Sequence, residues 1–157
     1  MKKQKGFSLI ELLIVVAIIL IIAAIAIPNL LRSRMAANEA SAVGSIRTIN
    51  TSAVTYSSTY PSNGFPVSLA AMGGANPCTA APGNACLLDP VLSAGTKSGY
   101  KFGWTGDGLT PSVNYTITGL PAVLGSSGQR GFYSDQSGVI RYTTDGSAPT
   151  VASPPLQ

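Results

Sequence analysis

The side chains that could support acid–base, nucleophilic or metal chemistry are few in this sequence and far apart. Its 157 residues contain no His, two Cys and six acidic residues. General acid–base catalysis most often uses His or a suitably placed carboxylate, and the acids here do not form closely spaced pairs. Two thiols without His cannot complete a four-ligand zinc site. The composition therefore predicts no enzyme activity, no metal site and no cofactor.

Cys78 and Cys86 flank a short segment that is rich in turn-forming residues, including Pro82 and Gly83. Pro and Gly favour a chain reversal, which could bring the two Cα atoms within the ~7 Å limit for a disulfide. Disulfides persist outside the cytoplasm, where the topology argued below places this part of the chain. A bridge between Cys78 and Cys86 is therefore predicted, whereas a Cys78 nucleophile would have no His to activate it.

Glu11 is the lone charged residue in an apolar run from Phe7 to Leu31. A charged side chain at the centre of a bilayer costs roughly 2.5–3.5 kcal/mol on insertion scales, and less near the edge, so its presence suggests a partner. Ser8 and Glu11 also have the spacing of a capping box, in which the two side chains satisfy amides of the first helical turn. Helix capping and pairing with a cation both remain open for Glu11.

The uncharged stretch from Leu12 to Leu31 has the length of a membrane-spanning helix. Its 20 residues would extend about 30 Å as a helix, which matches the hydrocarbon thickness of a bilayer. No small-residue A-x-A signal follows before Arg32, so we expect this segment to be retained rather than removed as a secretory signal.

The basic character of the chain is concentrated ahead of the apolar run. Lys2, Lys3 and Lys5 precede it, and without them seven Lys and Arg face six acids, which leaves a net charge of +1. Basic residues before a membrane span favour a cytoplasmic N-terminus. The remaining charge gives no support to nucleic acid as a main partner.

Beyond the apolar run, the pattern of an amphipathic helix continues. Apolar residues recur at helical steps, namely at Leu31, Met35, Ala42, Ile46, Ile49, Ala53, Tyr56 and Tyr60. We expect one helix from about Ser8 to about Thr59, because the Tyr60–Pro61 pair disfavours helical geometry. Since the pattern resumes directly after Pro28, that proline is predicted to bend the helix rather than to end it.

Glu39 lies in this second half of the predicted helix. No cation stands three or four residues from it, so no ion pair on its own helix is expected. The interpretation favoured by the sequence is a solvated glutamate. Pairing with Arg32 or Arg34 of an adjacent copy is the alternative, although exposed ion pairs contribute little.

The composition changes at Pro61, because 15 of the 17 Gly and 10 of the 11 Pro lie from this residue to the end of the sequence. Runs of β-forming residues between turn signals predict four strands, at Tyr100–Trp104, Asn114–Thr118, Arg130–Ser134 and Val139–Thr143. The last two are separated by residues 135–138 and are predicted to form a hairpin. The Pro-rich segment 145–157 is expected to be flexible.

The residues Gly6-Phe7-Ser8-Leu9-Ile10-Glu11, the apolar run after them and Ala26-Ile27-Pro28 resemble the class III signal of type IV pilins and pseudopilins. The resemblance implies that a membrane prepilin peptidase cuts after Gly6 and then N-methylates Phe7. It also implies that Glu11 is the assembly glutamate of the family and Pro28 its helix-bending proline. The new Phe7 amine lies four residues from Glu11, so Glu11 could pair with its own amine or with that of a neighbour.

The resemblance is close over about residues 1–60 and concerns only the architecture beyond them. It implies an α+β fold, with a long N-terminal helix packed on a small C-terminal antiparallel β-sheet. Residues 1–6 would be the leader, 7–31 the transmembrane and polymerisation helix, and 32–60 its amphipathic half. Residues 61–144 would form the globular β-rich domain and 145–157 the flexible tail.

The function implied by the resemblance is that of a structural subunit of a type IV pilus, serving adhesion, surface motility or DNA uptake. The precursor would be stored in the inner membrane as a single-pass protein and assembled into a homo-oligomeric helical filament. Its partners would be the prepilin peptidase, an assembly platform protein and an assembly ATPase. The filament would be extracellular.

Two other functions remain open, a major pseudopilin of type II secretion and a single-pass membrane-anchored binding domain. Major pseudopilins typically end in an acidic calcium-binding loop. Asp135 and Asp145 lie ten residues apart without further acids nearby, which favours the pilin. The chain also departs from many pilins, whose disulfide closes the C-terminal end of the globular domain, because Cys78 and Cys86 come early.

Overall fold

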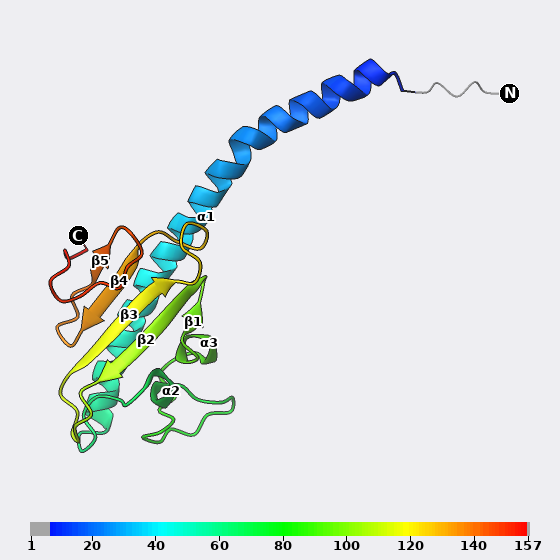
Figure 1. Ribbon diagram of the computed structural model, residues 1–157. Helices are drawn as coiled ribbons and strands as arrows, with labels where there is room; N and C mark the ends of the chain where they lie inside the picture. The colour runs from blue at the N-terminus through cyan, green and yellow to red at the C-terminus, as the bar shows by residue number, and fades with distance from the viewer. Residues whose placement is uncertain (1–6, 157) are drawn as a thin grey trace. The chain divides into compact units, whose positions relative to one another are not determined.

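The computed structural model describes residues 7–156 (Figure 1). They belong to two compact units that are divided between Arg34 and Met35. The described part of the first unit is the start of the chain and the apolar part of helix α1. The second unit contains the rest of α1, a five-stranded sheet and two short helices. The residues that precede position 7, including Gly6 of the predicted cleavage site, lie outside the described residues.

Helix α1 comprises Leu9–Thr59 and confirms the predicted long helix. It ends where the Tyr60–Pro61 pair was expected to end it, and Tyr60 N donates the last bond of the ladder, 2.9 Å from Tyr56 O. Pro28 lies inside the helix, so it does not terminate it. The bend attributed to Pro28 stays a prediction.

The sheet is an antiparallel meander in which the strands follow one another in chain order. Its strands are β1 (Thr96–Lys97), β2 (Tyr100–Gly106), β3 (Tyr115–Pro121), β4 (Gly131–Asp135) and β5 (Arg141–Thr143). β2 to β5 confirm the four predicted strands, and together with α1 they confirm the α+β class. The sequence analysis missed β1, which joins β2 through Ser98 and Gly99. Both turn residues have positive φ, at 49° and 73°, as a two-residue hairpin turn of type I′ requires.

The core lies between the sheet and residues 39–56 of α1, which runs behind the strands in Figure 1. Alternation along the strands turns one side chain in two toward the helix. The buried side chains of the core include Ile46, Ile49 and Tyr56 from α1 and Tyr100, Ile117 and Phe132 from the sheet. Gly119 lets α1 approach closely, because a Cβ there would lie 3.2 Å from Ile46 Cδ1.

Two one-turn helices, which the sequence analysis did not predict, precede the sheet. α2 (Leu69–Met72) begins at Ser68, whose hydroxyl accepts a bond from Ala71 N. α3 (Pro90–Ser93) begins at Asp89, whose carboxylate accepts from the amides of the first turn. These local caps, together with the burial of Leu69, Met72 and Leu92 in the core, explain why such short helices form.

The predicted hairpin between β4 and β5 is confirmed, with Phe132 paired to Tyr142. Its turn is closed by Gly138 N, which donates to Asp135 O at 2.9 Å, and Gly138 has the positive φ that favours Gly. Asp135 also accepts a bond from Ser137 N at 2.9 Å. The carboxylate thus organises its own turn, as Asp commonly does.

The segment 145–156 differs from the flexible tail that its composition suggested. Tyr142 N donates to Pro154 O at 3.1 Å, and Leu156 N donates to Ile140 O at 2.7 Å. Leu156 also packs against the hydrophobic core. The physical reason is that the tail covers the outer edge of β5, whose amides would otherwise lack partners. Proline suits this position because an edge segment can accept bonds without donating them.

The docked tail predicts that Leu156→Ala lowers the free energy of unfolding by roughly 1–2 kcal/mol, less than for a fully buried leucine because Leu156 is half-buried. Val151→Ala is the matched control from the same segment, since Val151 is 62% exposed, and it should change stability by no more than about 0.5 kcal/mol. Denaturant unfolding of the full chain in detergent measures both. Equal losses in the two variants would contradict a docked tail.

Candidate assembly site

The N-terminal part of α1 presents apolar side chains around its whole circumference. Every large apolar side chain from Phe7 to Leu31 is at least 39% exposed, and Phe7 is 86% exposed. Within residues 7–156, α1 is the one helix long and apolar enough to cross a membrane. A helix that is apolar on all sides is stable only when something covers it. This surface must therefore be buried by lipid or by other protein chains.

Glu11 lies in the first turn of this apolar helix and caps it. Its Oε2 accepts a hydrogen bond from Ser8 N at 2.8 Å, which is one of the two bonds of the predicted capping box. Leu12 N donates to Ser8 O at 3.2 Å and begins the helical ladder. A single amide leaves lone pairs of the carboxylate free for a further donor. The predicted pairing of Glu11 with an amine stays a prediction.

Glu39 is not solvated, so the prediction for this residue is wrong. It is only 7% exposed. Its Oε1 accepts from Gln129 N at 2.9 Å and from Arg130 N at 3.1 Å, while its Oε2 accepts from Arg130 Nε at 2.7 Å. The cation therefore comes from the segment before β4, at a sequence separation of 91 residues. Helical spacing rules could not reveal such a partner.

The surroundings of Glu39 keep it ionised and hold Arg130 in place. Burial opposes the charge, but the bonds from Gln129 and Arg130 outweigh it and lower the pKa of Glu39. The Arg130 guanidinium lies 5.6 Å from the Phe132 ring centre and 5.8 Å from that of Tyr142, within range of cation–π attraction. Removing a partner from such a buried, hydrogen-bonded carboxylate is strongly destabilising.

The segment before β4 is attached to α1 and β2 by more than this ion pair. Asn38 Nδ2 donates to Ser127 O at 2.8 Å, and Tyr100 Oη donates to Arg130 O at 2.8 Å. Burial, followed by the charge of Glu39, raises the pKa of Tyr100 to about 12, so this phenol remains a donor. Gly128 packs so closely on the Tyr100 ring that a Cβ would have no room. We call Glu39, Arg130 and these flanking bonds the helix–sheet latch.

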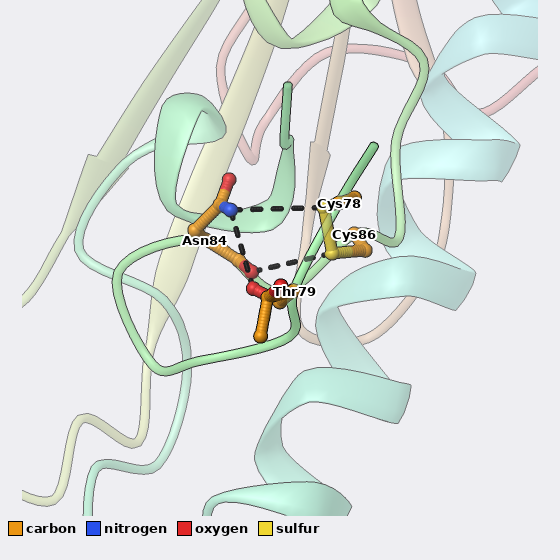
Figure 2. Close-up of a disulfide and its surroundings, with 4 residues drawn as sticks. All are labelled: Cys78, Thr79, Asn84 and Cys86. Atoms are coloured by element: carbon orange, nitrogen blue, oxygen red, sulfur yellow. Dashed lines mark hydrogen bonds between the residues drawn. A yellow bond between two sulfur atoms is a disulfide. The ribbon is translucent and has the colours of Figure 1, made fainter. Parts of the chain in front are cut away.

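The predicted disulfide between Cys78 and Cys86 is present (Figure 2). The two Cα atoms are 6.0 Å apart. Asn84 Nδ2 donates to Thr79 O at 3.3 Å inside the loop that the bridge closes. Closing a loop this short with a disulfide adds roughly 2.5–3 kcal/mol to the free energy of unfolding in the chain-entropy treatment of cross-links. The bridge therefore fixes an exposed loop that has little apolar surface of its own.

The disulfide loop is also bonded to α1. Tyr56 Oη donates to Pro82 O at 2.7 Å, and Ser52 Oγ donates to Leu87 O at 3.2 Å. Gly74 approaches the Cys78 sulfur without room for a Cβ. The loop thus forms a fixed surface beside the C-terminal half of the helix.

The aspartates of the second unit are bound in local structure. Asp107 accepts from Leu109 N at 3.1 Å and from Val113 N and Asn114 N at 2.9 Å each. These backbone bonds, the one from Leu109 above all, lower the pKa of Asp107 to about 2. Asp89 accepts from Lys97 Nζ at 3.0 Å in addition to capping α3. Among residues 7–156, no three Asp, Glu, His or Cys side chains gather as a metal site.

Comparison with known proteins agrees with the interpretation of the N-terminal residues. The family described as "Prokaryotic N-terminal methylation motif" matches residues 1–27. Over 39 residues, a quarter of this chain, the sequence is 64% identical to the type IV wide pilus major component PilA4 of Thermus thermophilus. The matched segment covers 30% of that protein. No solved structure matches the chain.

These two matches confirm the resemblance to type IV pilins for the N-terminal segment. The long helix on a small antiparallel sheet is the α+β fold that the resemblance implied. Both the apolar helix and the methylation motif fit a membrane-anchored precursor.

The latch predicts that Glu39→Gln lowers the free energy of unfolding at neutral pH by roughly 1.5–3 kcal/mol, because the amide keeps the size of the side chain but loses the charge-assisted bonds. The pKa of Glu39 is depressed in the folded chain, so its contribution is present above the ordinary pKa of about 4.3 and is lost as the pH falls through the folded value. Melting of both proteins across this range should show the difference narrowing with acidification. A difference that is constant with pH would contradict an ionised Glu39.

Proposed function

We propose that this chain is the structural subunit of a type IV pilus, stored in the inner membrane as a precursor and assembled into an extracellular filament through α1. The observation that carries the proposal is the exposed apolar surface of residues 7–31, most of which lies within the matched methylation motif. Such a surface is stable in lipid and, once outside lipid, only against other copies of itself. One segment would thus serve as membrane anchor and as polymerisation interface.

Processing after Gly6 would convert the membrane-anchored precursor into a subunit that can polymerise. Cleavage removes Lys2, Lys3 and Lys5, which hold the N-terminus on the cytoplasmic side, and it creates a free amine at Phe7. The prepilin peptidase is the partner for this step, and it would also methylate the amine. A platform protein and a cytoplasmic ATPase would then move the subunit from the membrane into the filament.

Glu11 would direct docking within the filament. Its carboxylate accepts one bond from Ser8 N in the single chain and can accept more. The Phe7 amine of a neighbouring copy supplies a matching cation in surroundings of low dielectric, where opposite charges attract strongly. This pairing would set the axial position of each helix against the next.

The second unit would cover the outside of the filament. Its sheet, latch and disulfide loop form a stable body around the C-terminal half of α1. The matched relative is itself described as a pilus component, which favours a pilus over the pseudopilus of type II secretion. Adhesion, surface motility and DNA uptake are the roles that a filament of this kind would serve.

The mature protein is predicted to begin at a methylated Phe7. The reason is that Gly6 follows a basic leader and precedes the matched motif. Intact-mass analysis of protein sheared from the cell surface measures the N-terminus directly. Surface protein that retains Met1 or begins after Ala26 would refute the proposed processing.

Glu11→Gln should insert into the membrane and be cleaved, yet accumulate there as unassembled subunit. The amide can still cap the helix, so capping alone would leave filament yield nearly normal, at a cost of a few tenths to about 1 kcal/mol. Loss of the charge would also ease residence in lipid and increase the preference for the membrane. The measurement is the ratio of cleaved subunit in the membrane to that in sheared filaments.

Asp145→Asn is the matched control, because it removes one acid at an exposed turn far along the chain from α1. It should leave both cleavage and filament yield unchanged. Normal filament yield from Glu11→Gln would show that docking does not need the charge. Uncleaved Glu11→Gln precursor would instead assign the residue to recognition by the peptidase.

A further inference from the structure

The outer face of the sheet, which is turned away from α1, carries a row of polar side chains. Thr105 of β2 pairs with Thr116 of β3, and Thr116 pairs with Asp135 of β4. Residues paired directly across neighbouring strands project from the same face. Tyr133 shares this face because it precedes Asp135 by two positions on β4. Three adjacent strands thus place a carboxylate, a phenol and two hydroxyls side by side.

This row forms part of a groove of about 370 Å³. The loop that precedes β3 contributes Asn114 to the lining, and the β4–β5 turn contributes Gln136. The volume is near the lower end of the range of roughly 300–1,000 Å³ that small-molecule sites occupy. The groove therefore has room for a small ligand and has a rigid sheet beneath it.

Four uncharged polar side chains that line the groove are not used to hold the fold together. Within residues 7–156, the side chains of Thr105, Thr116, Asn114 and Gln136 make no hydrogen bond. The inner face differs, because Asn50 of α1 donates to Ser134 at 2.9 Å and accepts from Tyr115 at 3.0 Å. Buried polar groups need such partners, whereas the free groups of the groove can exchange water for a ligand.

The charges of the groove select among ligands. Asp107 and Asp135 line it, whereas the cation beside it, Arg141, pairs with Tyr133 on the same face and donates to Ser153 O at 2.9 Å. The two carboxylates outnumber this cation, and their field disfavours phosphates, nucleic acids and acidic sugars. The acids do not form a metal cluster with a third ligand among residues 7–156. Burial, followed by the charge of Asp135, raises the pKa of Tyr133, so its phenol remains a donor.

We propose that this groove binds a neutral carbohydrate. Sugar hydroxyls both donate and accept, so they match a surface that combines a carboxylate, amides and hydroxyls. Asp135 would accept from sugar hydroxyls with the lone pairs that its turn leaves free, and Thr116, Gln136 and Asn114 would complete the polar contacts. The Tyr133 ring would pack against the apolar C–H face of the sugar.

The inference goes beyond the proposed filament role. The groove is built from strands and loops of the second unit, so a single subunit would bind without polymerising. Repetition of a weak site along a filament would raise the overall affinity through multivalency.

The test titrates the full chain, in a zwitterionic detergent that carries no sugar, with glucose, galactose, mannose and N-acetylglucosamine. Saturation-transfer NMR detects the contacts, and calorimetry gives the Kd, which should be millimolar for at least one of the four. Thr116→Val keeps the shape of a strand residue and should weaken binding by roughly five-fold through loss of one hydrogen bond. Asp135→Asn should weaken it by at least ten-fold, as expected for a bond to a charged group.

Asp145→Asn is the matched control, because Asp145 caps an exposed turn and does not line the groove. It should leave the Kd unchanged, and sialic acid should fail to bind the wild-type chain. Absence of saturable binding by all four sugars would overturn the proposal, as would equal affinity in Thr116→Val and wild type. Because the protein is unpolymerised in this assay, failure here is distinguishable from failure of the filament proposal.

Discussion

The rest of the molecule depends on the apolar surface of the N-terminal part of α1, which water cannot cover at an acceptable free energy. Residues 7–31 expose large apolar side chains on every side, and each buried methylene of such a surface is worth about 0.8 kcal/mol. Lipid and neighbouring copies are the two surroundings that can bury it. Since both are equally apolar, burial alone cannot decide between them. We infer that a polar group decides between them, and Glu11 is the lone ionisable side chain in the segment.

The second unit is subject to a different constraint. Its sheet packs against only one face of α1 and must be stable with that contact. The sheet supplies the apolar half of this stability through Tyr100, Ile117 and Phe132. The latch supplies a polar half, in which Glu39 and Arg130 join α1 to the segment before β4 at 2.7 Å. An ion pair with one buried partner, as here, adds little net stability compared with apolar packing, but leaving its buried carboxylate unpaired is costly. We infer that the latch contributes mainly to the unique placement of that segment.

Much of the secondary structure could be predicted from residues that lie close together in the sequence. The long helix was predictable because its apolar residues recur every three or four positions and the Tyr60–Pro61 pair follows directly at its end. The hairpin of β4 and β5 was predictable because its turn residues and strands are contiguous. The short helices α2 and α3 escaped prediction, since a single capped turn has no periodicity to detect. The docking of residues 145–156 was not predicted, because amino-acid composition indicates how much apolar surface a segment can bury. It does not indicate which strand edge the segment can pair with.

The sequence by itself determined the features that arise from neighbouring residues: the membrane-length helix, the processing motif, the four main strands and the short disulfide loop. Tertiary structure alone decided the partners of Glu39 and the docking of residues 145–156. It also decided which polar side chains of the strands serve the core and which stay free in the outer groove. The physical reason is the sequence separation of the residues that interact. A pattern along the chain records which faces are apolar, but a hydrogen bond between Glu39 and Arg130, separated by 91 residues, exists only after the sheet has brought them together.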